Sequence, residues 1–235
     1  MNRTDSAKTE ATIREEDAAR AALAGTRAER AKIAARALRN LLRDPDDTKQ
    51  VFLLGLVANA ARYPRLFAKF ATSAEGAALL RERPAIDGKA LAELRKMPPE
   101  TLGGAYARYL DDNGLDPDLF RAPPGLPPDA AYLAQRMRQT HDVWHVLTGY
   151  RPDVPGEVAL QGFTYGQTGM PSAGLIALAG CLKWARKRSG LARMTWDGYR
   201  RGKKAAFLPS VRWEELWGER VEEVRRRLGI EGARA

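Results

Sequence analysis

The amino-acid sequence predicts an all-α protein that folds as a single-domain helical bundle. Alanine, leucine, arginine and glutamate dominate the chain, and these residues favour helix. No run of alternating β-branched residues is long enough to predict a strand. The length of 235 residues, 44% of them hydrophobic, suits one domain with a sizeable core. We expect a polar, disordered tail at 1–25 and an all-helical, metal-binding domain at 26–235.

Proline, glycine and aspartate divide the first half of the chain into helices. The first helix is expected over 27–43, and the acidic cluster at 44–47 ends it and caps the next helix over 50–62. The pair Tyr63 and Pro64 is expected to interrupt the helical pattern. Further helices are expected at 65–82, as one or two short segments, at 90–95, and from 98 to 113.

A proline-rich connector at 115–128 leads into the second half of the chain. Asp129 is expected to cap a long helix that runs to Thr148, with Gly149 as its stop. Later helices are expected over 157–168, 172–188 and 213–228, with a basic stretch before the last of them.

The two histidines of the chain, His141 and His145, are the most informative feature of the sequence. They lie four residues apart on a predicted helix, and therefore on one face of it. Asp142 borders the same patch, and Glu157 follows twelve positions after His145, beyond a turn rich in glycine and proline that would reverse the chain. Nitrogen and oxygen ligands of this kind suit zinc, iron or manganese. The single cysteine, Cys181, takes no part.

Other interpretations of the histidine pair stay open. Without a metal, both side chains would be ordinary polar groups on a half-buried helix. Zinc peptidases with the H-E-x-x-H motif have a glutamate where this chain has Asp142, and His-Asp phosphohydrolases need further histidines that this sequence lacks. The metal site is the favoured interpretation, and a metal-dependent hydrolase is an alternative with weaker support.

A stretch of 25 residues without a charged side chain, at 158–182, suits contact with lipid. A proline, five glycines and several polar side chains disfavour a transmembrane helix there. Two helices that line an apolar tunnel and two helices that form a buried core hairpin are equally good interpretations. Gln161, Thr164 and Tyr165 follow Glu157 along the predicted helix, where they would order the metal ligand or the substrate head, or pack between helices.

The formal net charge is +10, and basic residues concentrate at 183–204 with Trp184, Trp196 and Tyr199 among them. Basic residues beside aromatic rings suit a surface of anionic lipid, and a solvated face is an equally strong interpretation. No helix-turn-helix, zinc-finger or RRM signature is present, so we expect no nucleic acid as a partner. The N-terminal residues resemble neither a signal peptide nor a mitochondrial presequence. We therefore expect a cytoplasmic protein, peripheral to the inner face of a bacterial cell membrane.

The segment HDVWHVLTGYRPDVPGE, at 141–157, resembles the H-D-x-x-H-x11-E signature of the Coq-four family of ubiquinone biosynthesis. Other segments that resemble this family are MPPETLG at 97–103 with the following Tyr106, the segment at 156–163 around the acidic ligand, and the C-terminal segment at 213–230. The resemblance covers about 35–230 and leaves the N-terminal residues out.

The resemblance implies an all-helical protein with a divalent metal, usually described as zinc. Its implied ligands, which are also the implied catalytic residues, are His141, Asp142, His145 and Glu157. The implied reaction removes the C1 carboxylate of a polyprenylated hydroxybenzoate and is coupled to hydroxylation at that carbon. Our candidate substrate-binding residues are Gln161, Tyr165 and Tyr106.

Several partners follow from the same resemblance. They are a prenylated aromatic substrate or lipid, other ubiquinone-biosynthesis proteins and the membrane surface, and a homodimer is compatible with the sequence. The alternative function is a non-catalytic, lipid-binding scaffold that organises a quinone-biosynthesis complex, in which the metal would be a structural element.

Overall fold

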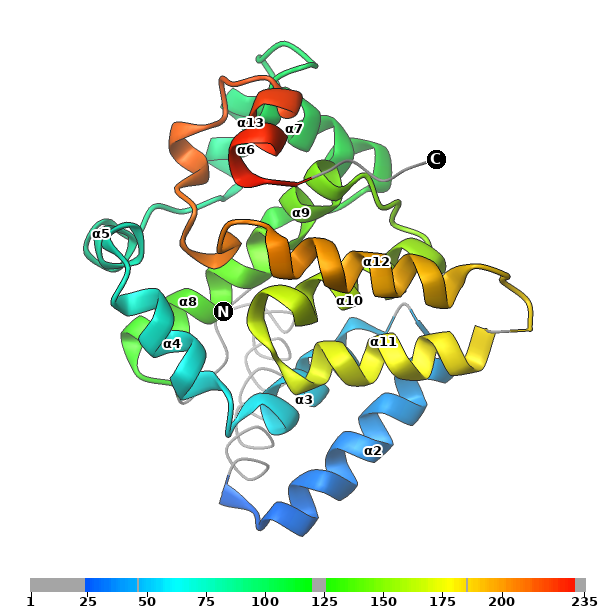
Figure 1. The fold of residues 1–235 in the computed structure, drawn as a ribbon. Helices are drawn as coiled ribbons and strands as arrows, with labels where there is room; N and C mark the ends of the chain where they lie inside the picture. The colour runs from blue at the N-terminus through cyan, green and yellow to red at the C-terminus, as the bar shows by residue number, and fades with distance from the viewer. Residues whose placement is uncertain (1–23, 46, 120–125, 185, 231–235) are drawn as a thin grey trace, which may run out of the picture.

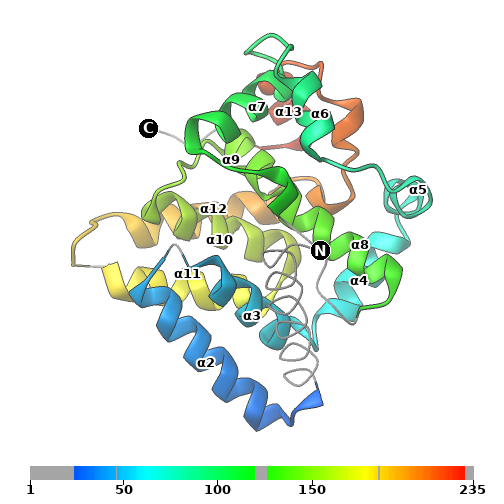
Figure 2. The ribbon, with the colours of Figure 1, turned by 180° about the vertical axis from the view of Figure 1, so that it is seen from behind.

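The computed structural model describes residues 24–45, 47–119, 126–184 and 186–230, which form helices joined by turns and loops (Figures 1 and 2). These residues contain no β-strand, and an isolated antiparallel bridge joins Thr101 to Arg220. The all-α, single-domain fold predicted from the sequence is confirmed. The predicted tail at 1–25 lies outside the described residues except for its last two positions.

The α-helices differ in length, and none of those in the described segments is long and apolar enough to cross a membrane. Their bounds are α2 (Arg27–Arg43), α3 (Thr48–Asn59), α4 (Tyr63–Ala71), α5 (Ala74–Glu82), α6 (Gly88–Leu94), α7 (Leu102–Asn113), α8 (Pro128–Gln139), α9 (His141–Thr148), α10 (Val154–Thr168), α11 (Pro171–Trp184), α12 (Leu191–Lys204) and α13 (Val221–Leu228). Short 3-10 helices lie at Pro117–Leu119, Leu208–Ser210 and Trp213–Glu215.

The helices pack around two groups of buried side chains. In Figure 1, α10 and α12 lie against each other across the middle of the molecule, with α11, α3 and α2 below them and α6, α7, α9 and α13 above. The larger buried group joins α6, α7, α9, α10 and α13 and includes Tyr106, Trp144, Phe163 and Trp213. The smaller group joins α4, α5 and α8 through Phe70, Leu79 and Leu133.

The helix predicted over 129–148 is in fact two helices. α8 ends at Gln139 and α9 begins at His141, because the backbone of Thr140 departs from regular helical geometry with φ −89° and ψ −3°. Thr140 is buried at this junction. The break sets the direction of α9 independently of α8, and α9 carries both histidines.

Other helix boundaries also differ from the prediction. Pro127, rather than Asp129, holds the N-cap position of α8, and Asp129 pairs instead with Arg83. Pro64 lies in the first turn of α4, where a missing N–H costs no helical hydrogen bond, so it starts a helix rather than interrupting one.

The basic stretch after α11 contains a helix, α12, that the sequence analysis did not predict. Its buried residues include Leu191, Thr195, Gly198 and Gly202, whereas most of its basic residues are exposed. Because two of these inward positions are glycines rather than large apolar residues, the hydrophobic periodicity is weak. The final helix, predicted over 213–228, is regular only in α13, after a 3-10 turn and a loop.

Glycines allow α10 and α12 to approach each other closely. Gly162 and Gly166 on α10 face backbone carbonyls of α12, and Gly198 and Gly202 on α12 face carbonyls of α10. A Cβ atom at any of these positions would lie 2.2 to 2.5 Å from a carbonyl oxygen of the opposite helix. The crossing therefore excludes side chains and fixes α10, which carries Glu157, within the bundle.

Replacing Gly202 with alanine is expected to lower the free energy of unfolding by about 1–2 kcal/mol, because the new Cβ would lie 2.2 Å from the carbonyl oxygen of Phe163. This crowding outweighs the ~1 kcal/mol by which alanine favours a helix over glycine. Urea unfolding followed by circular dichroism measures the change. Gly218→Ala is the control, since nothing lies within 4 Å of a Cβ there. Equal stability of the two variants would contradict the close crossing.

Candidate functional site

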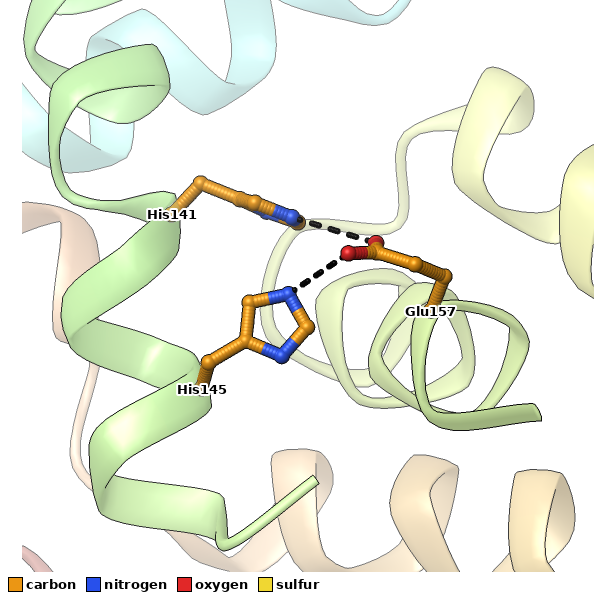
Figure 3. Close-up of side chains that lie close together, drawn as sticks. All are labelled: His141, His145 and Glu157. Carbon is orange, nitrogen blue, oxygen red and sulfur yellow. Dashed lines mark ion pairs between the residues drawn. The ribbon is translucent and has the colours of Figure 1, made fainter. Parts of the chain in front are cut away.

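Three side chains from two helices meet at one point (Figure 3). His141 and His145 lie one turn apart on α9, and Glu157 lies in the first turn of α10. The Nε2 atom of His145 is 2.9 Å from Oε1 of Glu157, and Nε2 of His141 is 3.5 Å from Oε2. One potential ligand atom of each residue lies within 4.8 Å of the other two. Three of the four residues that the sequence assigns to a metal site are thus neighbours in space.

The turn between α9 and α10 brings Glu157 back to the histidines. Gly149 ends α9 in the left-handed region, with φ 76°, which favours glycine. Asp153 caps α10 by accepting a hydrogen bond of 2.9 Å from the backbone N–H of Gly156. Gly156 packs so tightly that a Cβ atom would lie 2.0 Å from the carbonyl oxygen of Arg151. These local features set the position from which the Glu157 side chain extends.

The backbone holds His145 in one tautomer. Its Nδ1 atom lies 2.9 Å from the carbonyl oxygen of Tyr150, to which a protonated Nδ1 donates. Nε2 of the neutral ring then carries a lone pair, and this atom is buried without a hydrogen bond of acceptable geometry. The lone pair of such a neutral ring and the Glu157 carboxylate, both acceptors, face each other at 2.9 Å, and a proton on Nε2 or a metal cation between them would satisfy both. A ligating histidine typically donates its other nitrogen to a carbonyl in this way, so the residues fit a divalent metal.

The charges around the cluster also favour a cation. Burial alone would lower the pKa of His141, but the carboxylates of Glu157 and Asp142 outweigh it and raise that pKa above its ordinary value. Burial alone would raise the pKa of Glu157, but its contacts with both imidazoles hold the pKa well below the usual range. Glu157 is therefore ionised at neutral pH, as a carboxylate ligand must be.

Asp142, the fourth ligand implied by the family signature, does not join this group of ligand atoms. The residue is 7% exposed, and burial raises its pKa in spite of the opposing charges of the two imidazoles. It lies beside the cluster, where a carboxylate suits the orientation of a ligand or of a bound substrate.

The cluster opens into a large apolar cavity. This cavity has a volume of about 1360 Å³ and is bounded mainly by α2, α3, α8, α10 and α11. His141 and Glu157 line it, and 28% and 43% of their side chains, respectively, are exposed. Gln161 and Thr164, farther along α10, line it too. Apolar side chains that line it include Leu38, Leu42, Val51, Phe52, Leu56 and Ile176.

Tyr109 on α7 also lines this cavity and was missed in the sequence analysis. Its ring stacks on the imidazole of His145, with centroids 5.4 Å apart and planes at 19°. Its hydroxyl is buried without a hydrogen-bond partner among the described residues. Burial, reinforced by the charges of Asp142 and Glu157, raises the pKa of Tyr109, so the hydroxyl keeps its proton. No pattern in the sequence marks Tyr109, because its place beside His145 depends on the packing of α7 against α9.

The two other tyrosines singled out from the sequence lie away from the cavity. Tyr106 is fully buried and stacks on Trp217, with ring centroids 5.6 Å apart. Tyr165 is 41% exposed and stacks on Tyr199 of α12, with ring centroids 5.8 Å apart. Of the three candidate substrate-binding residues, Gln161 is the one that lines the cavity.

Comparison with known proteins decides the family. The family model described as coenzyme Q (ubiquinone) biosynthesis protein Coq4 matches residues 21–234 of this chain. The chain belongs to the Coq4 family. This result confirms the family predicted from the histidine signature, and the match extends beyond the resemblance at 35–230 at both ends.

Several curated members of the Coq4 family are 34–38% identical to this chain over the aligned segments. The ubiquinone biosynthesis protein coq4, mitochondrial, of Botryotinia fuckeliana is 38% identical over 164 residues, which cover 68% of this chain and 59% of that protein. The mitochondrial COQ4 homologue of Xenopus tropicalis is 35% identical over 194 residues, which cover 80% of this chain and 69% of that protein. The chain thus spans less than two thirds of the length of several Coq4 relatives that it matches.

A crystal structure has the same fold as this Coq4 family member. It is of a protein from Nostoc punctiforme PCC 73102 that was assigned to ubiquinone biosynthesis. The TM-score is 0.66 at 27% sequence identity, and the alignment covers 84% of this chain and 97% of that one. The helical arrangement described above is therefore shared with a solved structure.

The cluster is expected to bind one divalent ion per chain, and Glu157→Gln is expected to weaken zinc binding more than about 100-fold because it removes a charged ligand. His145→Ala should have the same effect. Asp142→Asn should keep one ion per chain, since Asp142 does not join the ligand group. Elemental analysis after dialysis and isothermal titration calorimetry measure content and affinity.

A matched control for this experiment is Glu223→Gln, the same chemical change on the surface of α13. It should bind zinc like the unmodified chain. Full zinc occupancy in Glu157→Gln, or loss of zinc from Asp142→Asn alone, would show that a different ligand set holds the ion.

Proposed function

We propose that this chain binds one divalent metal ion and removes the C1 carboxylate of a polyprenylated hydroxybenzoate in ubiquinone biosynthesis. The proposal rests on one observation, the cluster of His141, His145 and Glu157 at the wall of an apolar cavity of about 1360 Å³. Zinc suits this ligand set best, and iron and manganese are compatible with it. Membership of the Coq4 family supports the pathway.

The shape and lining of the cavity suit an amphiphilic substrate. Its polar part, with His141, Asp142, Glu157 and Gln161, would receive a ring that carries a carboxylate. Its apolar walls, from α2, α3 and α11, would receive an isoprenoid tail. The volume exceeds the 300–1,000 Å³ that is usual for small-molecule sites, as a long tail requires. The uncharged stretch at 158–182 was expected to line an apolar tunnel or to form a buried core hairpin. The proposed function assigns it to the wall of the tunnel.

The residues of the cavity have separate tasks in the proposed reaction. When bound, the cation would neutralise the carboxylate or phenolate and stabilise negative charge left on the ring as carbon dioxide departs. The bond from C1 to the carboxyl carbon breaks and its electron pair stays on C1. In the simple reaction a proton takes the vacant position. In the oxidative form, dioxygen would supply one oxygen atom to C1, and its second atom would leave as water with two protons and two electrons from an added reductant. Gln161 would donate a hydrogen bond to a substrate oxygen, and apolar walls would exclude water.

The purified chain, loaded in turn with zinc, iron(II) or manganese, is expected to release carbon dioxide from a prenylated hydroxybenzoate. Glu157→Gln should abolish the release because it removes a ligand. Gln161→Leu should lower turnover roughly three- to tenfold, the effect of losing one hydrogen bond, with metal content unchanged. Product analysis under dioxygen and under nitrogen separates the oxidative from the simple reaction.

Three results would oppose this function. Unchanged turnover in Glu157→Gln would remove the metal centre from the reaction. Tight binding of the substrate without turnover by any metal form would favour the lipid-binding scaffold. Hydrolysis of an ester or phosphate by the purified chain would favour a metal-dependent hydrolase.

We also propose that α11 and α12, which lie side by side (Figure 1), contact a membrane surface. Leu178 and Leu182, one turn apart on α11, are 60% and 72% exposed, and Trp196 on α12 is 62% exposed. Exposed Lys183 and Arg193 lie on the same two helices. Apolar and aromatic side chains beside basic ones are typical of surfaces that rest on anionic lipid.

Changing Leu178 and Leu182 together to serine is expected to lower binding to vesicles of phosphatidylcholine and phosphatidylglycerol at least about tenfold, because two leucines no longer enter the apolar layer. Co-sedimentation at physiological ionic strength measures the binding. The control changes Ala68 and Ala92, which are exposed on α4 and α6, to serine. Equal binding by both variants would contradict this surface, and a shift from dimer to monomer in the leucine variant alone would assign it to self-association.

A further inference from the structure

A second cavity, separate from the first, is lined by positive charge. It has a volume of about 410 Å³, and its lining residues come mainly from α4 and from the C-terminal parts of α10 and α12. Four cationic side chains line it, and no carboxylate is among its described lining residues. These side chains are Arg62, Arg65, Lys69 and Lys203. The two cavities share no lining residue.

The helical register places the cations together. Arg62, Arg65 and Lys69 lie at positions i, i+3 and i+7 at the start of and along α4, so they project from one face. Lys203, in the last turn of α12, lines the cavity from the other side. None of the four pairs with a carboxylate in the part of the chain that the structure describes. Elsewhere in the molecule several arginines do, such as Arg95 with Asp111 at 2.6 Å.

The surroundings of two of these cations are defined. The ammonium of Lys69 lies 3.8 Å from the ring centroid of Phe207, which covers one side of it. Burial, with the charge of Lys203 as the second cause, lowers the pKa of Lys69. Arg62 packs so closely on Gly169 that a Cβ there would lie 2.8 Å from the guanidinium. Like charges are thus held near one another, an arrangement that an anion would stabilise.

Two uncharged polar side chains of the cavity, Gln167 and Thr168, are already hydrogen-bonded within the protein. Gln167 donates to the carbonyl of Gly202 at 2.6 Å and accepts from the N–H of Leu208 at 2.8 Å. The Thr168 hydroxyl donates to a carbonyl one turn earlier and accepts from the N–H of Met170. The side chains left to meet a ligand include the four cations and the hydroxyls of Tyr165 and Tyr199. The cations select an anion over a neutral polar molecule, and a hydroxyl can donate a further hydrogen bond to it.

We propose that this cavity binds a phosphate group. A phosphate offers several acceptor oxygens and more than one negative charge, which suits two guanidinium groups and two ammonium groups better than a single carboxylate does. The same chemistry occurs in soluble phosphates and in phospholipid headgroups. The cavity adjoins the membrane-contacting face that we proposed on α11 and α12. Tyr199 lines the cavity, and its ring stacks on exposed Trp196 of that face with centroids 5.2 Å apart.

The test uses the full chain and two probes at physiological ionic strength. Inorganic pyrophosphate is titrated by calorimetry, and vesicles of phosphatidylcholine with and without phosphatidylglycerol are used in co-sedimentation. The variant K69E/K203E should weaken binding of the favoured probe at least about tenfold, because two of the four cations become anions. The milder K69Q/K203Q should weaken it less and serves if the charge reversal fails to fold.

The matched control is K32E/K89E, which makes the same change in net charge at exposed positions on α2 and α6. His145→Ala, which lacks the proposed metal centre, should bind pyrophosphate like the unmodified chain. If the unmodified chain binds pyrophosphate and only the cavity variants lose this binding, the result supports a soluble phosphate as the ligand. If the unmodified chain binds only the vesicles that contain phosphatidylglycerol, and the same variants lose that binding, the result supports a phospholipid headgroup.

Three outcomes would overturn the proposal. The first is no binding of either probe. The second is equal weakening in K32E/K89E, which would indicate a general effect of charge. The third is loss of pyrophosphate binding in His145→Ala, which would place the anion on the metal.

Discussion

The buried Nε2 atom of His145 faces the carboxylate of Glu157 at 2.9 Å, and the proposed function depends on this contact. A hydrogen bond from Nδ1 to the carbonyl of Tyr150 keeps the single proton of the neutral ring on Nδ1, so Nε2 faces the carboxylate with its lone pair. The fold keeps them together because α9 is packed in the core and the turn into α10 is fixed by a cap and by glycines. A divalent cation between the two acceptors would bind both, and the adjoining cavity would give it access to a substrate.

One helix connects the main features of the molecule. The first turn of α10 carries Glu157, the next turns line the apolar cavity through Gln161 and Thr164, and the last turn lines the basic cavity. The glycine crossing with α12 holds this helix in place without side chains between the two backbones. A shift of α10 would therefore move Glu157 and the lining of both cavities together.

Parts of the site that lie close together in the sequence could be predicted, and parts that come from distant segments could not. The histidines and Glu157 are joined by one helical turn and one short loop, so local spacing was enough to bring them together. Helix α2 was also predicted to its ends, from its amphipathic pattern and the acidic cluster that follows it, and the structure adds a capping box at its start. Tyr109 and the basic cavity depend on packing between helices far apart in the sequence, which periodicity does not encode. The break at Thr140 has the same origin, since the local sequence favours an uninterrupted helix.

The metal centre is tested most directly by diffraction from crystals of the full chain saturated with zinc, measured at the zinc absorption edge. We predict one anomalous peak per chain between α9 and α10, about 2.0–2.2 Å from Nε2 of His141, Nε2 of His145 and a carboxylate oxygen of Glu157. A zinc ion held by other residues, or saturated crystals with no peak at this point, would contradict the role given to the two imidazoles and the carboxylate.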